Sequence, residues 1–329
     1  MQVVALAGGI GGARFLRGLL AHLDAAAVAA EVTVIGNTAD DIVLHGLHVS
    51  PDLDTVMYTL GGGIHPEQGW GRAEDTRSVQ KELTAYGEGP EWFALGDRDI
   101  ATHLVRTRLL SEGATLSEAT AVLCERWRPG VRLLPMSDDP VTTHVTIADP
   151  STADGTRTLH FQEYWVRLGA PDALAVIPVG ADKAAPAPGV CEAIDSADVV
   201  LLPPSNPVVS IGTILAVPGI SEALAATPAP VVGLSPIIGG APVRGMADKM
   251  LAAIGVPTSA AAVALHYGAR RAGGLLDGWL VDSGDAASVA TVEAAGIRCR
   301  AVPLLMRDLA ASAAMAAEAL TLAAVVAGR

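Results

Sequence analysis

Short apolar runs rich in β-branched residues alternate with helical stretches along most of this 329-residue chain. Such alternation is typical of βαβ units, in which helices cover a parallel sheet. Strands are predicted at residues 2–7, 31–35, 198–202, 230–234, 277–281 and 297–302. Helices are predicted at about 12–23, 75–86, 98–111, 115–127, 210–226, 244–254, 283–295 and 307–327. The sequence therefore predicts an α/β fold, Rossmann-like and doubly wound, with a mainly parallel sheet.

The pattern changes between residues 61 and 170. Helical stretches are followed there by two strand-like runs, THVTIAD and TRTLHFQEYWV, which a turn-like Ala-Asp-Gly separates. We interpret residues 61–170 as a helical and β-hairpin insertion that covers the active site. Residues 1–60 and 171–329 then form the Rossmann-like core.

Composition excludes several classes of protein. Half of the residues are apolar, which is enough to bury a sizeable core. The net charge of −13 argues against a nucleic-acid surface. Neither a signal peptide nor an uninterrupted apolar run of about 18 residues is apparent, so no membrane span is expected. Three widely spaced cysteines offer no disulfide framework, and we expect a cytoplasmic protein.

Nearly every predicted strand runs directly into a loop of Gly, Pro, Ser, Asn or Asp. In open α/β sheets the loops at the carboxyl ends of the strands line the ligand crevice, so several should converge on one site. The loops are GGIGG (8–12), GNTADD (36–41), PPSNP (203–207), SPIIGG (235–240) and DSGD (282–285).

The first loop places Gly8, Gly9, Gly11 and Gly12 between a strand and a helix. Without Cβ atoms, backbone N–H groups can approach an anion at the helix N-terminus, and a pyrophosphate suits this chemistry. The spacing matches neither a P-loop nor a dinucleotide fingerprint. A tight turn that serves only packing is the alternative.

Four aspartates, Asp40, Asp41, Asp52 and Asp54, follow the second strand. Mg²⁺ takes one or two carboxylates together with phosphate oxygens and water, and Asp41 and Asp54 could face the glycine loop across the crevice. A proline after Ser50 indicates a helix start, so Asp52 or Ser50 is expected as its cap. Solvated charge is the alternative for the other aspartates.

Two polar groups lie in the predicted insertion. Asp97 and Arg98 form a Gly-Asp-Arg-Asp turn, in which Arg98 has planar donors that match carboxylate or phosphate. His144 and Trp165 belong to the second group, and the indole of Trp165 could stack on a flat ligand. Helix capping, an exposed ion pair and core packing are the alternatives.

These stretches together resemble the 2-phospho-L-lactate transferase family of coenzyme F420 biosynthesis, in particular its actinobacterial branch. The resemblance covers essentially the whole chain. It rests on LAGGIGGARFLRGL, GNTADDIVLHGLHVSPDLDTVMYTLGGG, GWGRAEDT, WFALGDRDIATHLVRT, CERWRPGVRLLPMSDDPVTTHV, FQEYWV, LLPPSNPVVSIGTIL, VVGLSPIIGGAPVRGMADKML and VDSGD. Ala39 departs from the glycine expected before the paired aspartates.

The resemblance implies a donor in which guanosine diphosphate carries an enolpyruvyl or lactyl group on its outer phosphate. The acceptor would be the deazaflavin Fo, whose terminal ribityl hydroxyl attacks that phosphorus and releases GMP. Asp41 and Asp54 would be the catalytic, Mg²⁺-binding pair, and a homodimer is expected. Donor contacts are expected from Gly8, Gly9, Gly11, Gly12, Asn37, Ser205, Asn206, Pro207, Ser235, Gly239 and Gly240. Acceptor contacts are expected from Asp97, Arg98, His144 and Trp165.

Two other functions compete with this one. A non-catalytic regulator that binds nucleotide sugars would share the glycine-rich opening and would need no acceptor pocket. A dehydrogenase fits less well, because the glycine spacing departs from the nicotinamide fingerprint.

Overall fold

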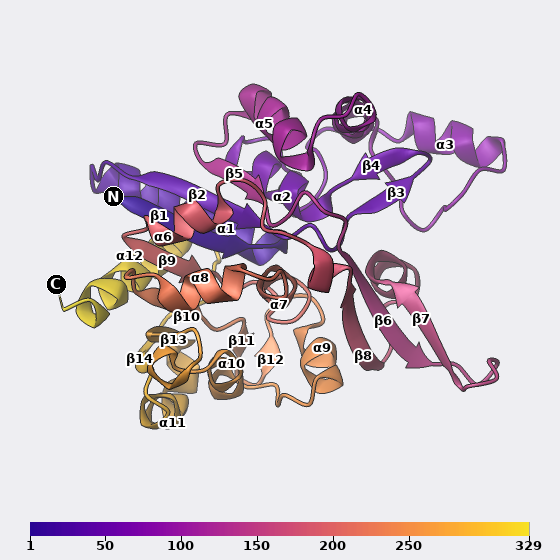
Figure 1. Cartoon of the computed structure of the whole chain (residues 1–329). Coiled ribbons are helices and arrows are strands. Elements are labelled where there is room, and N and C mark those ends of the chain that lie inside the picture. Colours follow the sequence, from indigo (N-terminus) through magenta and orange to yellow (C-terminus); the bar gives the residue numbers. More distant parts are fainter. Residues whose placement is uncertain (329) are drawn as a thin grey trace.

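A parallel sheet of seven strands forms the centre of the computed structural model, which describes residues 1–328 (Figure 1). The strand order is β14-β13-β10-β9-β1-β2-β5, and all neighbouring strands are parallel. The strands are β1 (Gln2–Ala7), β2 (Glu31–Gly36), β5 (Arg132–Pro135), β9 (Val199–Leu202), β10 (Val231–Leu234), β13 (Gly278–Asp282) and β14 (Arg298–Val302). In chain order this is the doubly wound arrangement 3-2-1-4-5-6 with one further edge strand. The predicted Rossmann-like α/β fold is confirmed.

The order of the strands reverses between β1 and β9. In doubly wound sheets, ligands bind in the crevice outside the carboxyl ends of the strands at this switch point. The loops that follow β1 and β9 meet there, because the Ser205 hydroxyl donates to the carbonyl of Gly8 at 2.8 Å. The carbonyl of Pro204 also lies against Gly11 and leaves no room for a Cβ.

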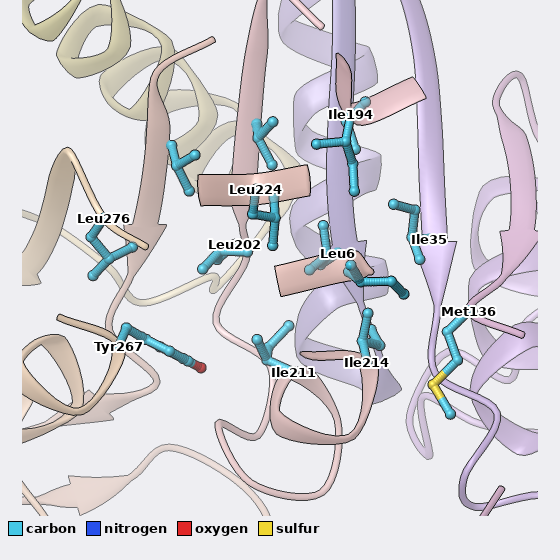
Figure 2. Close-up of a cluster of buried hydrophobic side chains, with 14 of the residues drawn as sticks. Leu6, Ile35, Met136, Ile194, Leu202, Ile211, Ile214, Leu224, Tyr267 and Leu276 are labelled. Carbon is cyan, nitrogen blue, oxygen red and sulfur yellow. The ribbon is translucent and has the colours of Figure 1, made fainter. Parts of the chain in front are cut away.

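Two apolar cores lie on opposite faces of the sheet, because successive strand side chains point to opposite sides. In β1, Val4 and Leu6 belong to the first core, whereas Val3 and Ala5 belong to the second. Figure 2 shows Leu6 within the first core. Helices over the first core are α6 (Val190–Asp195), α7 (Ile211–Leu215), α8 (Ile220–Ala226), α9 (Ala247–Ala253), α10 (Ala260–Tyr267) and α11 (Val289–Ala294). Those over the second are α1 (Gly9–Ala25), α2 (Pro51–Leu60), α5 (Leu116–Trp127) and α12 (Leu309–Val326).

The last helix, α12, is long and apolar enough to cross a membrane, with a mean hydropathy of 1.8 and 33% of its window buried. Core helices of soluble proteins pass the same test, so this is weak evidence of a membrane span. Ser312, Met315, Ala319 and Leu322 recur at helical spacing on its buried face, and this face packs on α1. One face of α12 therefore belongs to the core.

The remaining elements flank the carboxyl edge of the central sheet. β6 (Thr142–Ala148), β7 (Thr156–His160) and β8 (Ala173–Val179) form an antiparallel sheet that extends away from the core in Figure 1. Two hairpins are formed by β3 (Ile42–Leu44) with β4 (Leu47–Val49) and by β11 (Ile237–Ile238) with β12 (Ala241–Pro242). Two further helices are α3 (Ser78–Ala85) and α4 (Asp97–Ser111), and short 3₁₀ segments occur at Ala181–Lys183, Arg270–Ala272 and Ser283–Ser288.

The sheets divide the chain differently from the predicted boundaries. β8 pairs with β6, so the small sheet extends past residue 170 to Val179. β5 lies within residues 61–170 but pairs with β2 in the central sheet. Sequence reasoning did not predict β5, whose sequence, RLLP, ends in a proline that argues against an interior strand.

Three predicted elements are corrected by the structure. The helix predicted at 210–226 is two helices, because Pro218 lacks a backbone N–H and Gly219 takes a φ of 99°. The helix predicted at 283–295 begins as a 3₁₀ segment and becomes α11 only at residue 289. The strand predicted through TRTLHFQEYWV ends at His160, whose ring Nδ1 accepts from the N–H of Gln162 at 3.0 Å, and a π-helical turn follows.

We predict that Gly18→Ala destabilises the fold by about 1–3 kcal/mol, because its Cβ would overlap the backbone and Cβ of Ser312 where α1 packs on α12. Chemical denaturation measures the free energy of unfolding. Arg17→Ala is the control, since Arg17 is exposed on the same helix. An unchanged denaturation midpoint for Gly18→Ala would contradict the close α1–α12 contact.

Candidate active site

The glycine loop opens helix α1 at the switch point. Gly8 is the N-cap, and Gly9 takes a φ of 64° that favours glycine. Protein atoms fill the space beside Gly8, Gly11 and Gly12, whereas the nearest atom to a Cβ at Gly9 is Asp52 Oδ1 at 3.8 Å. Packing therefore explains three of these glycines. Within residues 1–328 the N-cap residue of α1 makes no side-chain hydrogen bond, but the Asp52 carboxylate lies beside Gly8 and Gly9, and the Gly9 N–H favours its charged form. The start of α1 suits an anion, which would lie next to Asp52.

Asn37 is fully buried and links the loop after β2 to the first turn of α2 and to the segment after β9. Its Nδ2 donates to Asp52 Oδ2 at 2.9 Å and to the Val209 carbonyl at 3.2 Å. Its Oδ1 accepts from the N–H of Ala39 at 3.0 Å and from the Thr213 hydroxyl at 2.7 Å. All the hydrogen-bonding positions of Asn37 are satisfied within the protein. Its role here is to hold the loops, and the predicted donor contact stays untested.

The other predicted donor residues also hold loops. Besides its donation to Gly8, Ser205 accepts the Gly8 N–H at 3.3 Å. Oδ1 of Asn206 accepts the N–H groups of Val208 and Val209, the two residues after Pro207. The Ser235 hydroxyl makes two bonds with the backbone of Ile237. The exposed Gly239 and Gly240, with φ values of 60° and 81°, form the β11–β12 turn. The loops lie at the crevice, but their side chains bond within the loops. Backbone groups are therefore the main candidates for contacts with the donor substrate.

The aspartates form a cluster at the carboxyl end of β2. Asp40, Asp52 and Asp54 are buried, and Asp41 accepts the Ser50 hydroxyl at 2.6 Å through Oδ2. Oδ1 of Asp40 and Oδ1 of Asp41 are buried without a hydrogen-bond partner in residues 1–328. The predicted helix cap is not made by either candidate, because Asp52 bonds Asn37 and Ser50 bonds Asp41.

The electrostatics of this cluster disfavour full ionisation. Burial raises the pKa of Asp40 well above its ordinary value, and the charges of Asp52 and Asp41 raise it further. Burial likewise raises the pKa of Asp41, against the hydrogen bond from Ser50. The pKa of Asp52 is raised by burial to about 6. A bound cation would lower all three values by favouring the carboxylate forms.

Asp54 is paired with a buried arginine from α4. Both terminal nitrogens of Arg106 bond its carboxylate, with Nη1 at 3.0 Å from Oδ2. Nη1 also donates to the His48 carbonyl at 3.3 Å. Within residues 1–328, Arg106 is the only buried Lys or Arg side chain, with 1% exposed. It therefore supplies the local positive charge of the cluster.

Further contacts beside this pair join α2 to α4. Tyr58 donates to Asp99 Oδ1 at 2.7 Å, and His103 Nε2 lies 3.6 Å from the same oxygen. His103 Nδ1 lies 3.6 Å from Asp54 Oδ2. The sequence draws attention to His103, as an imidazole that follows the Gly-Asp-Arg-Asp turn, but sequence reasoning missed Arg106. The signal for Arg106 was the spacing of positions 99, 103 and 106, which puts one acidic and two basic side chains on the same face of α4.

The small sheet docks on the aspartate loop through a histidine that sequence reasoning also missed. His160 Nδ1 accepts a backbone N–H, so its Nε2 donates to the Asp41 carbonyl at 3.0 Å. Burial lowers the pKa of His160, which favours this neutral form. Gln162 donates to the Asp40 carbonyl at 3.3 Å. The predicted acceptor residue His144 is paired in register with His160, so the sheet brings His144 close to this loop.

The other three predicted acceptor residues lie elsewhere. Asp97 accepts from the Thr76 hydroxyl and from the N–H groups of residues 78 and 79, so it caps α3. Arg98 is exposed near Glu74, 3.9 Å away. It precedes Arg106 by eight residues, which is about 12 Å of helical rise. Trp165 is 37% exposed on the π-helical turn. Acceptor binding by Asp97 and Arg98 remains a prediction that this geometry does not favour.

The carboxylates fit a hard divalent cation. Residues 1–328 contain no preformed group of three His, Cys, Asp or Glu ligands. Mg²⁺ needs fewer protein ligands, since phosphates and water complete its shell. Asp40 and Asp41 offer unpartnered oxygens, and each Asp54 oxygen keeps a second lone pair beside Arg106.

Comparison with known proteins places the chain in a family. The model of the family described as 2-phospho-L-lactate transferase CofD matches residues 3–305. Proteins named phosphoenolpyruvate transferase are 70% identical in Kitasatospora aureofaciens, 66% in Streptomyces coelicolor and 61% in Thermobifida fusca. Each of these matches covers 98% of both chains. The chain belongs to the 2-phospho-L-lactate transferase CofD family, which confirms the resemblance found in the sequence.

Solved structures support the same fold. Two crystal structures of protein BH3568 from Bacillus halodurans, in one case described as a member of the UPF0052 family, match with TM-scores of 0.59 and 0.61. The matches cover 97% of this chain and 99% and 98% of theirs, at 18% sequence identity. At that identity the likeness shows the fold alone.

We predict that Arg106→Ala destabilises the protein by about 3–5 kcal/mol, because it leaves the buried Asp54 carboxylate without its partner. Urea denaturation tests this free energy. The exposed Arg108, which pairs with Glu112, gives the control Arg108→Ala, and we expect a change within about 0.5 kcal/mol. Equal effects of the two substitutions would contradict a buried, stabilising ion pair.

We predict that Asp97→Ala speeds amide hydrogen exchange in α3 and leaves α4 protected, because Asp75 caps α4 separately. The hydrogen bond from Thr76 lowers the pKa of Asp97 from 3.8 to about 2. A lowered acid pKa stabilises the fold above the unfolded value of 3.8, and that stabilisation is lost as the pH falls through about 2. The difference in α3 hydrogen exchange between the parent protein and Asp97→Ala should therefore shrink as the pH falls from 3.8 to about 2. A difference that does not change with pH would exclude the carboxylate cap.

Proposed function

We propose that this chain transfers the phosphoenolpyruvyl group of a GDP-linked donor to the terminal ribityl hydroxyl of the deazaflavin Fo, and releases GMP, in coenzyme F420 biosynthesis. Family membership and full-length relatives named phosphoenolpyruvate transferase support this assignment. That name favours the enolpyruvyl donor over the lactyl donor. The observation that carries the proposal is the start of α1 facing a buried aspartate cluster at the switch point.

The donor diphosphate would lie at the N-terminus of α1. The open position at Gly9 and the first N–H groups of the helix suit phosphate oxygens. The loops after β9 and β10, which contain Asn206 and Ser235, would surround the guanosine. This placement follows the rule that doubly wound folds bind nucleotides across the switch point.

The reaction would need no covalent bond between the protein and either substrate. The ribityl oxygen forms a bond to the outer phosphorus, the bond from that phosphorus to the GMP oxygen breaks, and the hydroxyl proton leaves to water. The chain's own groups position the two substrates in line. His160 and Gln162 fix the backbone of the aspartate loop, and Arg106 fixes Asp54.

Mg²⁺ is part of the proposal. Asp41 and Asp54 would hold it, with Asp40 near by. Asp40 and Asp41 each have a buried oxygen without a partner, and each Asp54 oxygen keeps a second lone pair beside Arg106. When bound, Mg²⁺ supplies positive charge that stabilises the phosphate oxygens.

The acceptor would approach from the side of the small sheet. The β6–β7 strands carry His144 and His160 to the aspartate loop, and Trp165 follows β7. Fo would then lie between this sheet and the carboxyl edge of the core, opposite the departing GMP. A homodimer and a cytoplasmic location also stay predictions.

We predict that Asp41→Asn lowers turnover on the order of 100-fold or more, because it removes charge beside the reacting phosphate. The assay incubates enzyme, Mg²⁺, Fo and each donor, and weighs the product by mass spectrometry. Asp24→Asn, an exposed change at the far end of α1, is the control with expected normal turnover.

The same assay separates the alternatives. A product only from the enolpyruvyl donor supports the proposal, and a product only from the lactyl donor identifies the other transferase. Tight GDP binding without any product from either donor would favour the non-catalytic regulator. Equal calorimetric affinities for ADP and GDP would contradict the guanosine site.

A further inference from the structure

A pocket lies at the opposite end of α2 from the aspartate cluster. Its volume is about 570 Å³, within the range of small-molecule sites. Its lining residues are Gly61, Gly62, Gly63, Arg72, Ala73, Glu74, Arg98, Arg126 and Trp127. The pocket therefore combines three arginines with a single acidic residue in a chain whose net charge is −13.

Two of the arginines share one aromatic ring. The guanidinium carbon of Arg72 lies 4.3 Å from the ring centroid of Trp127 and 5.3 Å from that of Tyr58. The guanidinium carbon of Arg126 lies 4.7 Å from the ring of Trp127. Contact with the same indole holds two positive charges close together, and stacking leaves their N–H edges free for an acceptor.

These two arginines have no partner of opposite charge. Within residues 1–328, neither Arg72 nor Arg126 forms an ion pair, and Nε of Arg72 is buried without an acceptor. Burial lowers the pKa of Arg72 and the nearby charge of Arg126 lowers it further, whereas the more distant carboxylates of Asp99 and Asp75 raise it. Glu74 is mostly exposed and lies near Arg98 instead, at 3.9 Å. A buried N–H donor without an acceptor is costly, so this arrangement favours an anion that bonds it.

The pocket adjoins the candidate active site, since Tyr58 contacts both Arg72 and Asp99, but it does not include the aspartate cluster. Arg98 stands in the first turn of α4, whereas Arg106 meets Asp54 eight residues later, about 12 Å along the helix. Gly61 follows the C-terminus of α2, whereas Asp54 lies in its first turn. None of the four clustered aspartates lines the pocket.

We propose that the pocket formed by Arg72, Arg98, Arg126 and Trp127 is a second ligand site, which binds the phosphate group of a small molecule. Guanidinium groups present paired donors that match phosphate oxygens. The triple glycine explains how the pocket forms, because a Cβ at Gly61 or Gly63 would overlap the indole of Trp127. The site lies beyond the proposed transfer reaction and does not depend on it.

The test is calorimetric titration of the full chain with inorganic phosphate at fixed ionic strength. GDP is present in excess, so that the proposed donor site is filled. Arg126→Gln and Arg72→Gln are compared with Arg108→Gln, which removes an exposed arginine of α4 outside the pocket. We expect phosphate affinity to fall about tenfold or more in the two pocket variants and to stay within about twofold in the control.

Two further measurements make the outcome decisive. Acetate at equal concentration separates phosphate recognition from binding of any carboxylate, and we expect it to bind more weakly. Circular dichroism checks the folding of each variant, and Arg126 is exposed, so its replacement should leave the fold intact. No phosphate binding by the parent protein, or equal affinity in parent and Arg126→Gln, would overturn the proposal.

Discussion

Buried negative charge at the carboxyl edge of the sheet is the constraint on which the site depends. Asp40, Asp52 and Asp54 are buried beside Asp41, and Arg106 is the only buried Lys or Arg side chain in residues 1–328. Removing carboxylates from water is costly unless each is paired or hydrogen-bonded. The single guanidinium pairs with Asp54, and its charge also acts on Asp41. Burial still raises the pKa values of Asp40 and Asp41, so a further cation would favour their carboxylate forms.

The doubly wound topology places this charge beside an anion site. The switch point brings the start of α1 next to the loop after β2, and Asn37 ties that loop to Asp52 and to the loop after β9. A helix N-terminus attracts phosphate, whereas clustered carboxylates repel it. A divalent cation resolves the conflict, because it binds both groups at once. The fold and the buried charges therefore both favour a site that binds a phosphate together with a divalent cation.

The sequence predicted the sheet well, because strand-length apolar runs and the loops that follow them are local features. It also placed Asp41 and the glycine loop at the carboxyl edge of the same sheet. It could not show that Arg106, 52 residues from Asp54 along the chain, completes the cluster. Nor could it show that Asp97 caps a neighbouring helix, since such pairings depend on tertiary packing. The break at Pro218, in contrast, was readable from the proline itself.

The most direct test of this account measures Mn²⁺ binding, with Mn²⁺ used in place of Mg²⁺. Electron paramagnetic resonance detects the bound ion, and GDP is present. The account predicts one tight Mn²⁺ per chain, with affinity about tenfold or more weaker in Asp41→Asn. The exposed change Asp24→Asn should leave the affinity unaltered. Equal Mn²⁺ affinity in Asp41→Asn and the parent protein would contradict the claim that the aspartate cluster is a cation site.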